Sequence, residues 1–190
     1  LSSTYGQDSK VPAELRKKDP ANILFARGPV KRLSGEQLRD QALALSGLLH
    51  PEIGGPPVKP YLPDSATWRV LNNFLPEYVR DKAPNIYRRS LYTYWRRTAP
   101  PPGMLAFDVP GREVCTVRRQ QTNTPLQPLV TLNDPQFVEA ARGMAIRMIR
   151  EGGPDFTTRA KWLFRETLDR EATEEELRIL AEIHSEQGGI

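Results

Sequence analysis

Proline restricts the regular structure of this chain more than any other residue type does. The sequence has 190 residues and 18 prolines, most of which lie between Pro51 and Pro135. Because proline lacks a backbone N–H and has a fixed φ, it interrupts the hydrogen bonding of helices and sheets. We therefore expect residues 53–133 to form an irregular segment of short elements and long ordered loops.

The residues before this segment carry a clear helix signal. Residues 1–52 are expected to be the N-terminal helical part, and Ser34 and Gln37 have the spacing of a capping box. A stripe of apolar residues at helical spacing follows the box: Leu38, Ala42, Leu45 and Leu49. This stripe is expected to face the core.

Residues 134–190 are expected to form the C-terminal helices. Asp134 precedes Pro135, and these residue types suit an N-cap and the first position of a helix. Thr173 and Glu176 repeat the capping-box spacing near the C-terminus. Short connections between these helices favour antiparallel packing.

Two regular features are expected inside the irregular segment. Residues 86–95 are rich in aromatic side chains and are expected to be extended. A short buried turn is expected from four apolar residues: Trp68, Leu71, Phe74 and Leu75. The predicted fold is mainly α: one domain over residues 1–190, a helical bundle with a proline- and arginine-rich irregular central segment and one or two short strands.

Composition excludes several kinds of site. The lone cysteine, Cys115, rules out an internal disulfide and a cysteine-rich metal site, and its β-branched neighbours predict a small buried residue. His50 and His184 lie at expected helix ends without a cluster of carboxylates, so we expect no metal and no cofactor in this segment. No apolar run approaches the length that crosses a bilayer.

Arginine is concentrated in three adjacent pairs: Arg88-Arg89, Arg96-Arg97 and Arg118-Arg119. Arginine is permanently charged and presents a fork of donors, so each pair needs carboxylates, carbonyls or a bound anion nearby. One interpretation is a structural network in which the pairs contact Asp108, Glu113 and the acidic C-terminal helices. The other interpretation is a face that binds an acidic polysaccharide. The guanidinium groups would donate hydrogen bonds to its sulfate or carboxylate groups.

Other side chains could contribute to such a binding face. Tyr94 and Trp95 lie between two arginine pairs and could stack on sugar rings, and Asn123 is also a candidate ligand-binding residue. The same aromatic residues, with Tyr92, suit a single-stranded nucleic-acid platform. Nucleic acid is the weaker alternative, because the net charge is only +4 and no nucleic-acid motif is present.

A catalytic alternative rests on two carboxylates. Asp108 and Glu113 flank the turn formed by Pro110 and Gly111, and paired carboxylates are what glycoside hydrolysis requires. The alternative function is therefore a polysaccharide-acting hydrolase. Salt bridges to nearby arginines explain the same two acids without catalysis.

Several uncommon strings occur together in this chain. They are RGPVKRLSGEQLRDQALALSGLL, IGGPPVKPY, RRSLYTYWRRTAPPPGMLAFDVPGREVCTVRRQQTNTPLQPLVTLNDPQF and LFRETLDREATEEEL. With them the chain resembles the planctomycete-type domain of unknown function fifteen fifty-three, over nearly its whole length. The family pattern continues upstream of Leu1, so we expect the start of the domain to be missing. Pro128 departs from the pattern, and we expect it to interrupt the family helix between Thr124 and Leu132.

The resemblance also carries expectations about context. Domains of this family occur at the C-terminal end of large cell-envelope proteins that often also carry a cytochrome c domain. It implies a periplasmic or extracellular location, and other domains of the same parent protein as partners, cytochrome c-like ones among them. It implies no established activity. We therefore expect a non-catalytic structural or binding module.

Overall fold

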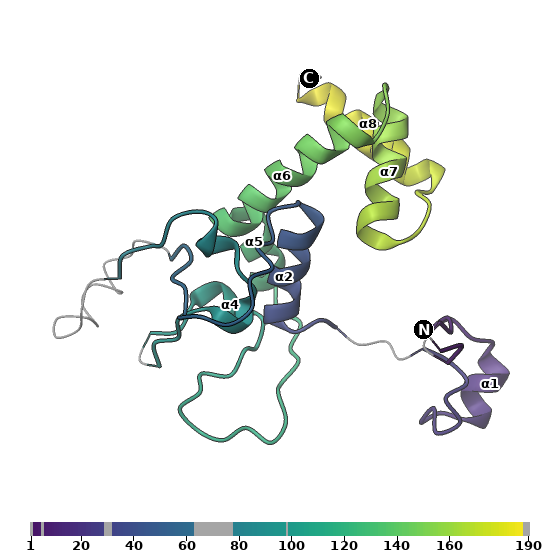
Figure 1. The fold of residues 1–190 in the computed structure, drawn as a ribbon. Helices are drawn as coiled ribbons and strands as arrows, with labels where there is room; N and C mark the ends of the chain where they lie inside the picture. The colour runs from purple at the N-terminus through teal and green to yellow at the C-terminus, as the bar shows by residue number, and fades with distance from the viewer. Residues whose placement is uncertain (1, 5, 29–31, 63–77, 98, 188–190) are drawn as a thin grey trace. The chain divides into compact units, whose positions relative to one another are not determined.

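The structure is a computed structural model, which describes residues 2–4, 6–28, 32–62, 78–97 and 99–187. Its described part is mainly helical, as the sequence predicts, and it divides into two compact units, Leu1–Leu33 and Ser34–Ile190 (Figure 1). The expected division into parts at residues 52 and 133 stays a prediction. The buried turn expected at Trp68, Leu71, Phe74 and Leu75 lies outside the described residues.

Within its described residues, the first unit contains one short helix and a hydrogen-bonded loop. Helix α1 spans Ala13–Lys18. After it, the Asp19 carboxylate accepts hydrogen bonds from the amides of Ile23 and Leu24 at 2.9 and 2.8 Å. The Arg27 guanidinium donates to the backbone oxygen of Asp19 at 2.7 Å and closes the loop.

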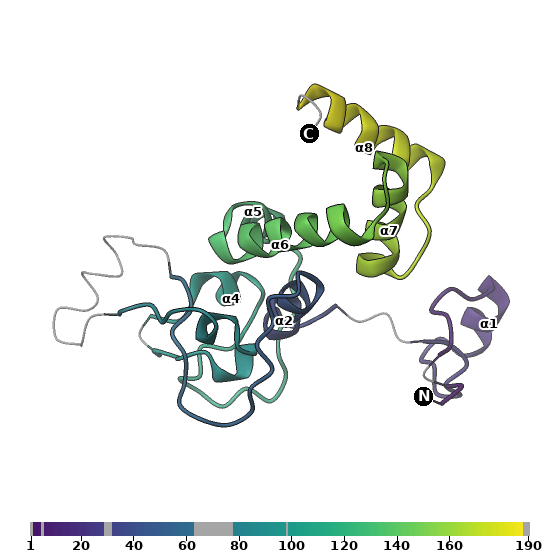
Figure 2. The same cartoon turned by 45° about the horizontal axis from the view of Figure 1, so that its top comes forward.

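The second unit is built around its longest helix. Its helices are α2 (Gly35–Leu45), α4 (Pro102–Ala106), α5 (Leu126–Asn133), α6 (Pro135–Glu151), α7 (Phe156–Leu168) and α8 (Glu174–Glu186). Helix α6 packs against α2, α5 and α7, α4 contacts α2 and α5, and α8 packs on α7 (Figure 2). Arg147 links three of these helices: from α6 it donates to the Leu45 carbonyl at the end of α2 and forms an ion pair with Glu166 of α7 at 3.2 Å.

Local capping signals place the helix starts correctly. Ser34 and Gln37 form the expected capping box of α2, and Thr173 and Glu176 form that of α8. Asp134 caps α6 by accepting a hydrogen bond from the amide of Gln136. These signals succeed because each involves residues only two or three positions apart.

The expectation that Pro128 interrupts a helix is wrong. Helix α5 begins at Leu126, so Pro128 lies in its first turn. The amides of the first helical turn have no intrahelical partner, and a proline there removes no hydrogen bond.

Residues 86–95 do not form the expected strand. They contain two 3-10 turns, η1 (Asn85–Tyr87) and η2 (Ser90–Tyr92), and the described residues show only two isolated parallel bridges, His50 with Arg88 and Val58 with Thr93. The segment is therefore bound to the chain before it at two points rather than along a ladder. Its conformation depends on side chains, and these form the candidate site.

The buried face of α2 is offset from the predicted apolar stripe. Its buried residues are Gly35, Arg39 and Leu43, whereas Leu38 and Ala42 lie beside this line and are only partly buried. The centre of the face is thus a charged side chain. The apolar core around it consists of Leu43, Val58, Ile86, Ala99, Met104, Phe107, Val109, Ala140, Met144 and Ala160.

Candidate functional site

Arg39 is a buried cation that joins α2 to two distant parts of the chain. It is only 6% exposed. Its Nε donates to Oε1 of Gln136 on α6 at 2.7 Å. One terminal nitrogen donates to the backbone oxygen of Arg88 at 2.9 Å and to Oγ of Ser90 at 3.2 Å. The other donates to the backbone oxygen of Ile86 at 2.8 Å.

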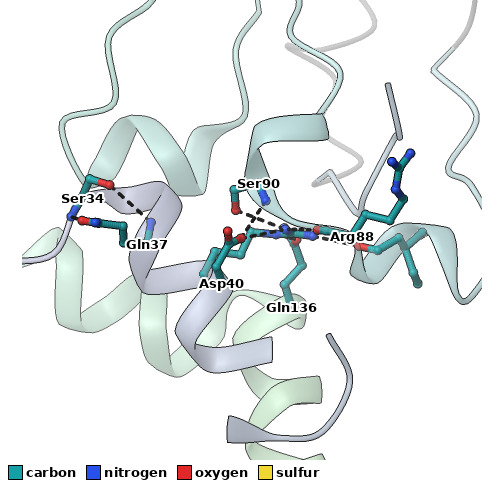
Figure 3. A network of polar contacts seen from close by, with 8 residues as sticks. Ser34, Gln37, Asp40, Arg88, Ser90 and Gln136 are labelled. Carbon is teal, nitrogen blue, oxygen red and sulfur yellow. Dashed lines mark hydrogen bonds and ion pairs between the residues drawn. The ribbon is translucent and has the colours of Figure 1, made fainter. Parts of the chain in front are cut away.

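The neighbours of Arg39 are held by further hydrogen bonds. The carboxylate of Asp40 accepts from the amide of Ser90 at 2.7 Å and lies 3.9 Å from the Arg39 guanidinium. Gln136 in turn donates to the backbone oxygen of Tyr61 at 3.3 Å. Figure 3 shows Asp40, Ser90 and Gln136 gathered at one place, between α2, the 86–92 turns and α6.

A second buried arginine holds the glycine-rich loop before the site. Arg88 is 2% exposed. Its terminal nitrogens donate to the backbone oxygens of Pro56, Gly54 and, at 3.4 Å, Glu52. The guanidinium lies over the ring of Tyr92, 4.1 Å from its centre, and the Tyr92 hydroxyl accepts from the Gly54 amide at 2.8 Å. The loop and the turns therefore hold one another in place.

The acidic groups near Arg39 offset part of the burial of its charge. Burial lowers the pKa of its guanidinium, whereas Asp40 and Asp134 raise it. The group nevertheless remains charged, since arginine does not lose its proton in proteins. Together Arg39 and Arg88 direct their donors mainly at backbone carbonyls, which fixes an irregular chain without a sheet.

A cleft lies beside Arg39, between α2, α4 and the start of α6. Its volume is about 460 Å³ including open solvent, and apolar walls come from Pro60, Tyr61, Pro101, Phe107 and Phe137. Four polar side chains also line it: Arg39, Thr93, Asp134 and Gln136. Burial raises the pKa of the Asp134 carboxyl. Oγ1 of Thr93 is buried without a hydrogen-bond partner. Apart from these polar groups, the cleft is an apolar surface.

The three arginine pairs do not converge on one site within the described residues. Arg89 and Arg97 are exposed, and both members of the third pair, Arg118 and Arg119, are exposed. Arg88 is buried against carbonyls, and Arg96 is half-buried. Arg119 pairs with Glu36 of α2 at 3.0 Å. The acids of the C-terminal helices form ion pairs with arginines close in sequence, such as Arg170 with Glu176 and Arg178 with Glu182.

The two candidate aromatic residues are engaged inside the fold. Tyr94 makes a tilted ring contact with Tyr78 at 6.4 Å between centres. Trp95 donates from Nε1 to the backbone oxygen of Gly111 at 3.0 Å, and the Arg112 guanidinium lies 4.5 Å from its ring centre. Both residues are half-buried.

The remaining candidates lie along the loop between α4 and α5. The Asp108 carboxylate accepts from the amide and the hydroxyl of Thr122, both at 2.7 Å. Glu113 and Asn123 are exposed. No described residue forms hydrogen bonds with both Glu113 and Asp108. Cys115 is exposed, which corrects the expectation of a buried thiol: its segment forms no sheet that would cover it.

Arg39 was missed as a site residue, although the sequence contains a signal for it. Gly35, Arg39 and Leu43 follow one another at four-residue spacing, which places the arginine on one helix face between a glycine and a leucine. An arginine in that position is either a break in the apolar face or a buried donor. Its acceptors are 47 to 97 residues away, so sequence alone could not distinguish the two.

The described residues offer no metal site and no membrane-spanning helix. Among the described residues, no three His, Cys, Asp or Glu side chains are grouped so that they could hold a metal ion. Within the same residues, no helix combines the length and the apolar character that crossing a membrane requires.

Comparison with protein families decides where the chain belongs. The model of the family described as PSD1, Protein of unknown function (DUF1553), matches residues 1–184. The chain belongs to this family. The match confirms the resemblance to DUF1553 found in the sequence and covers the whole arginine site. No curated protein and no solved structure matches the chain.

Proposed function

We propose that this DUF1553 chain is a non-catalytic structural module of a larger cell-envelope protein. In this proposal, buried arginines hold a proline-rich segment on a helical scaffold, which then presents a fixed surface to other domains of the same parent protein. Cytochrome c-like domains are the partners that the family resemblance suggests.

The proposal is supported most by the use of the arginine donors. Arg39 and Arg88 are 6% and 2% exposed, and their terminal nitrogens donate to the backbone carbonyls of five different residues. A guanidinium that served a ligand would keep its donors available to it. These two instead stabilise the chain that surrounds them.

Replacing Arg39 tests the structural role. Arg39→Met keeps the volume but leaves the carbonyls of Ile86 and Arg88 buried without a donor. Each stranded acceptor costs about 1–3 kcal/mol, so we expect the free energy of unfolding to fall by about 3 kcal/mol. Urea unfolding followed by circular dichroism measures this.

The matched control is Arg142→Met, since Arg142 is an exposed arginine on α6. An exposed substitution of this kind is expected to change stability by less than about 0.5 kcal/mol. Equal effects of the two substitutions would contradict the structural role of Arg39.

A second candidate function is binding of acidic polysaccharide. The observation that favours it is that Arg89, Arg97 and Arg118 are exposed and form no ion pair with a described residue. Three available guanidinium groups suit sulfate or carboxylate groups on a flexible polymer. Tyr94 and Trp95 would add half-exposed aromatic edges.

Affinity measurements test this second function. We expect the triple variant Arg89→Ala, Arg97→Ala, Arg118→Ala to bind heparin or polygalacturonate at least about tenfold more weakly, with an unchanged melting temperature. Arg142→Ala is the control for nonspecific charge. Arg89→Ala, Arg97→Ala and Arg118→Ala made singly are each expected to weaken binding more than Arg142→Ala does. Equal effects would show that the arginines act only through net charge.

A further inference from the structure

Three large apolar side chains lie together at the surface of the first unit. Ile23, Leu24 and Phe25 are 74%, 68% and 67% exposed, and they are consecutive in the loop that follows α1 (Figure 1). Single exposed apolar residues are ordinary on a protein, whereas a contiguous exposed patch indicates an interaction site. We call these three residues the apolar tip.

The loop fixes the apolar tip and satisfies its backbone donors. Both oxygens of the buried Asp19 carboxylate accept hydrogen bonds, one from the Ile23 amide and the other from the Leu24 amide. The Phe25 amide donates to the backbone oxygen of Asn22 at 3.3 Å. Moving the tip into an apolar phase would therefore leave none of its three N–H groups without an acceptor, which removes a main cost of such a transfer.

The conformation of Phe25 also favours an external partner. Its φ is 50°, in the left-handed region that a bulky side chain rarely adopts. Since the ring is mostly exposed, the described residues supply little packing to offset this strain. Strained residues of this kind are concentrated at binding sites. Burial of the ring against a partner would supply the missing packing.

The net positive charge of the protein lies in the same unit. Residues 1–33 contain seven Lys and Arg against three Asp and Glu, a net charge of +4, whereas residues 34–190 contain 20 of each sign. Arg16, Lys17 and Lys18 form the exposed last turn of α1, shortly before the tip. None of these three forms an ion pair with a described residue. Exposed apolar residues beside unpaired cations are the combination that binds the surface of an anionic bilayer.

We propose that the apolar tip inserts between the headgroups of an anionic lipid bilayer, while Arg16, Lys17 and Lys18 bind the lipid phosphates. Insertion into lipid requires no preformed pocket of matching shape, and it removes all three apolar side chains from water. The cations add an electrostatic attraction to the lipid surface. This contact is additional to the structural role proposed for the buried arginines of the second unit and does not depend on it.

Sedimentation with lipid vesicles tests the apolar tip. The full chain is expected to bind vesicles made of equal amounts of phosphatidylcholine and phosphatidylglycerol. The double variant Leu24→Gln, Phe25→Asn is expected to bind them at least about tenfold more weakly, because two side chains no longer leave water. Asparagine tolerates the left-handed conformation, so Phe25→Asn removes the ring and keeps the backbone. Ile53→Gln is the matched control: Ile53 is 86% exposed but lies between Glu52 and Gly54, outside any apolar run.

Charge reversal tests the cations. Lys18→Glu is expected to weaken binding to the same vesicles at least about fivefold, because attraction to the lipid phosphates becomes repulsion. Arg142→Glu changes the net charge equally but lies on α6 in the second unit, so it is expected to weaken binding less than about twofold. Vesicles of phosphatidylcholine alone are expected to bind the original chain at least about tenfold more weakly than the anionic vesicles.

Fluorescence quenching distinguishes insertion from adsorption to the headgroups. Phospholipids brominated in their acyl chains quench only an indole that reaches the apolar part of the bilayer. In a Leu24→Trp variant bound to such vesicles, the additional tryptophan is expected to be quenched. The tryptophans of the original chain are expected to be quenched less.

Four results overturn the proposal. They are no binding to anionic vesicles, equal binding by the original chain and the tip variant, equal effects of Lys18→Glu and Arg142→Glu, and no additional quenching in Leu24→Trp. A melting temperature of the tip variant that falls by more than about 4 °C also overturns it, because the tip would then be buried within the protein itself.

Discussion

At Asp134, one carboxylate caps a helix and lines an apolar cleft. It accepts a hydrogen bond from the Gln136 amide at 2.9 Å, and a Cβ on Gly103 would lie 2.9 Å from its other oxygen. Burial raises its pKa above the ordinary value of 3.8, and the Gln136 amide and Arg39 oppose this rise. The cap is thus retained although its charge is unfavourable there.

The raised pKa gives a stability that depends on pH. A group with a raised pKa in the folded state contributes stability below its unfolded pKa, and this contribution is lost as pH rises through the folded pKa. Asp134→Asn keeps the cap without the charge. We expect the unfolding free energy of the original chain to fall more than that of the variant as pH rises from about 3 to 7. Urea unfolding at several pH values measures this, and parallel curves would contradict it.

Among the elements, the crossing of α2 and α6 depends on a close approach at Gly143. A Cβ at this position would lie 3.0 Å from both Cβ and the backbone oxygen of Ser46. Ser46 is the C-cap of α2, so the end of that helix lies directly against α6. A side chain at position 143 would require Ser46 and the end of α2 to shift away from α6.

Gly143→Ala is therefore expected to destabilise the fold by about 1–3 kcal/mol, although alanine is the better helix former. Thermal and urea unfolding measure the change. Gly111→Ala is the control, because nothing lies within 4 Å of a Cβ there. A more stable Gly143→Ala variant would show that helix propensity outweighs the contact.

The elements also show which parts of the fold a sequence can predict. The capping boxes of α2 and α8 and the Asp134 cap were predictable, since a cap involves neighbours along the chain. The conformation of residues 86–95 was not predictable from the sequence. Aromatic content favours an extended chain, whereas the actual conformation is set by Arg39, 47 residues before Ile86. The arginine pairs include Arg88, one of the two buried arginines among the described residues. Which arginine is buried depends on contacts between distant residues.

At the scale of the whole molecule, the arginine site belongs to one compact unit. All acceptors of Arg39 and Arg88 lie within Ser34–Ile190, and Ser34 itself caps the first helix of that unit. The first unit, Leu1–Leu33, has its own network around Asp19. Each unit therefore has its own set of stabilising contacts.

A chain shortened to residues 34–190 tests this independence. We expect it to unfold cooperatively, with a melting temperature within about 4 °C of the full chain, which corresponds to less than about 1–2 kcal/mol. Differential scanning calorimetry measures both quantities. Loss of cooperative unfolding would mean that the first unit supplies contacts essential to the second.

Helix α8 contains no buried residue and packs on α7, so few apolar contacts oppose its release. Its backbone amides are accordingly expected to exchange with deuterium through local opening, sooner than those of α2, where Arg39 and Leu43 are buried. In a parent protein, this helix would be the part of the module that a neighbouring domain rigidifies with the smallest rearrangement.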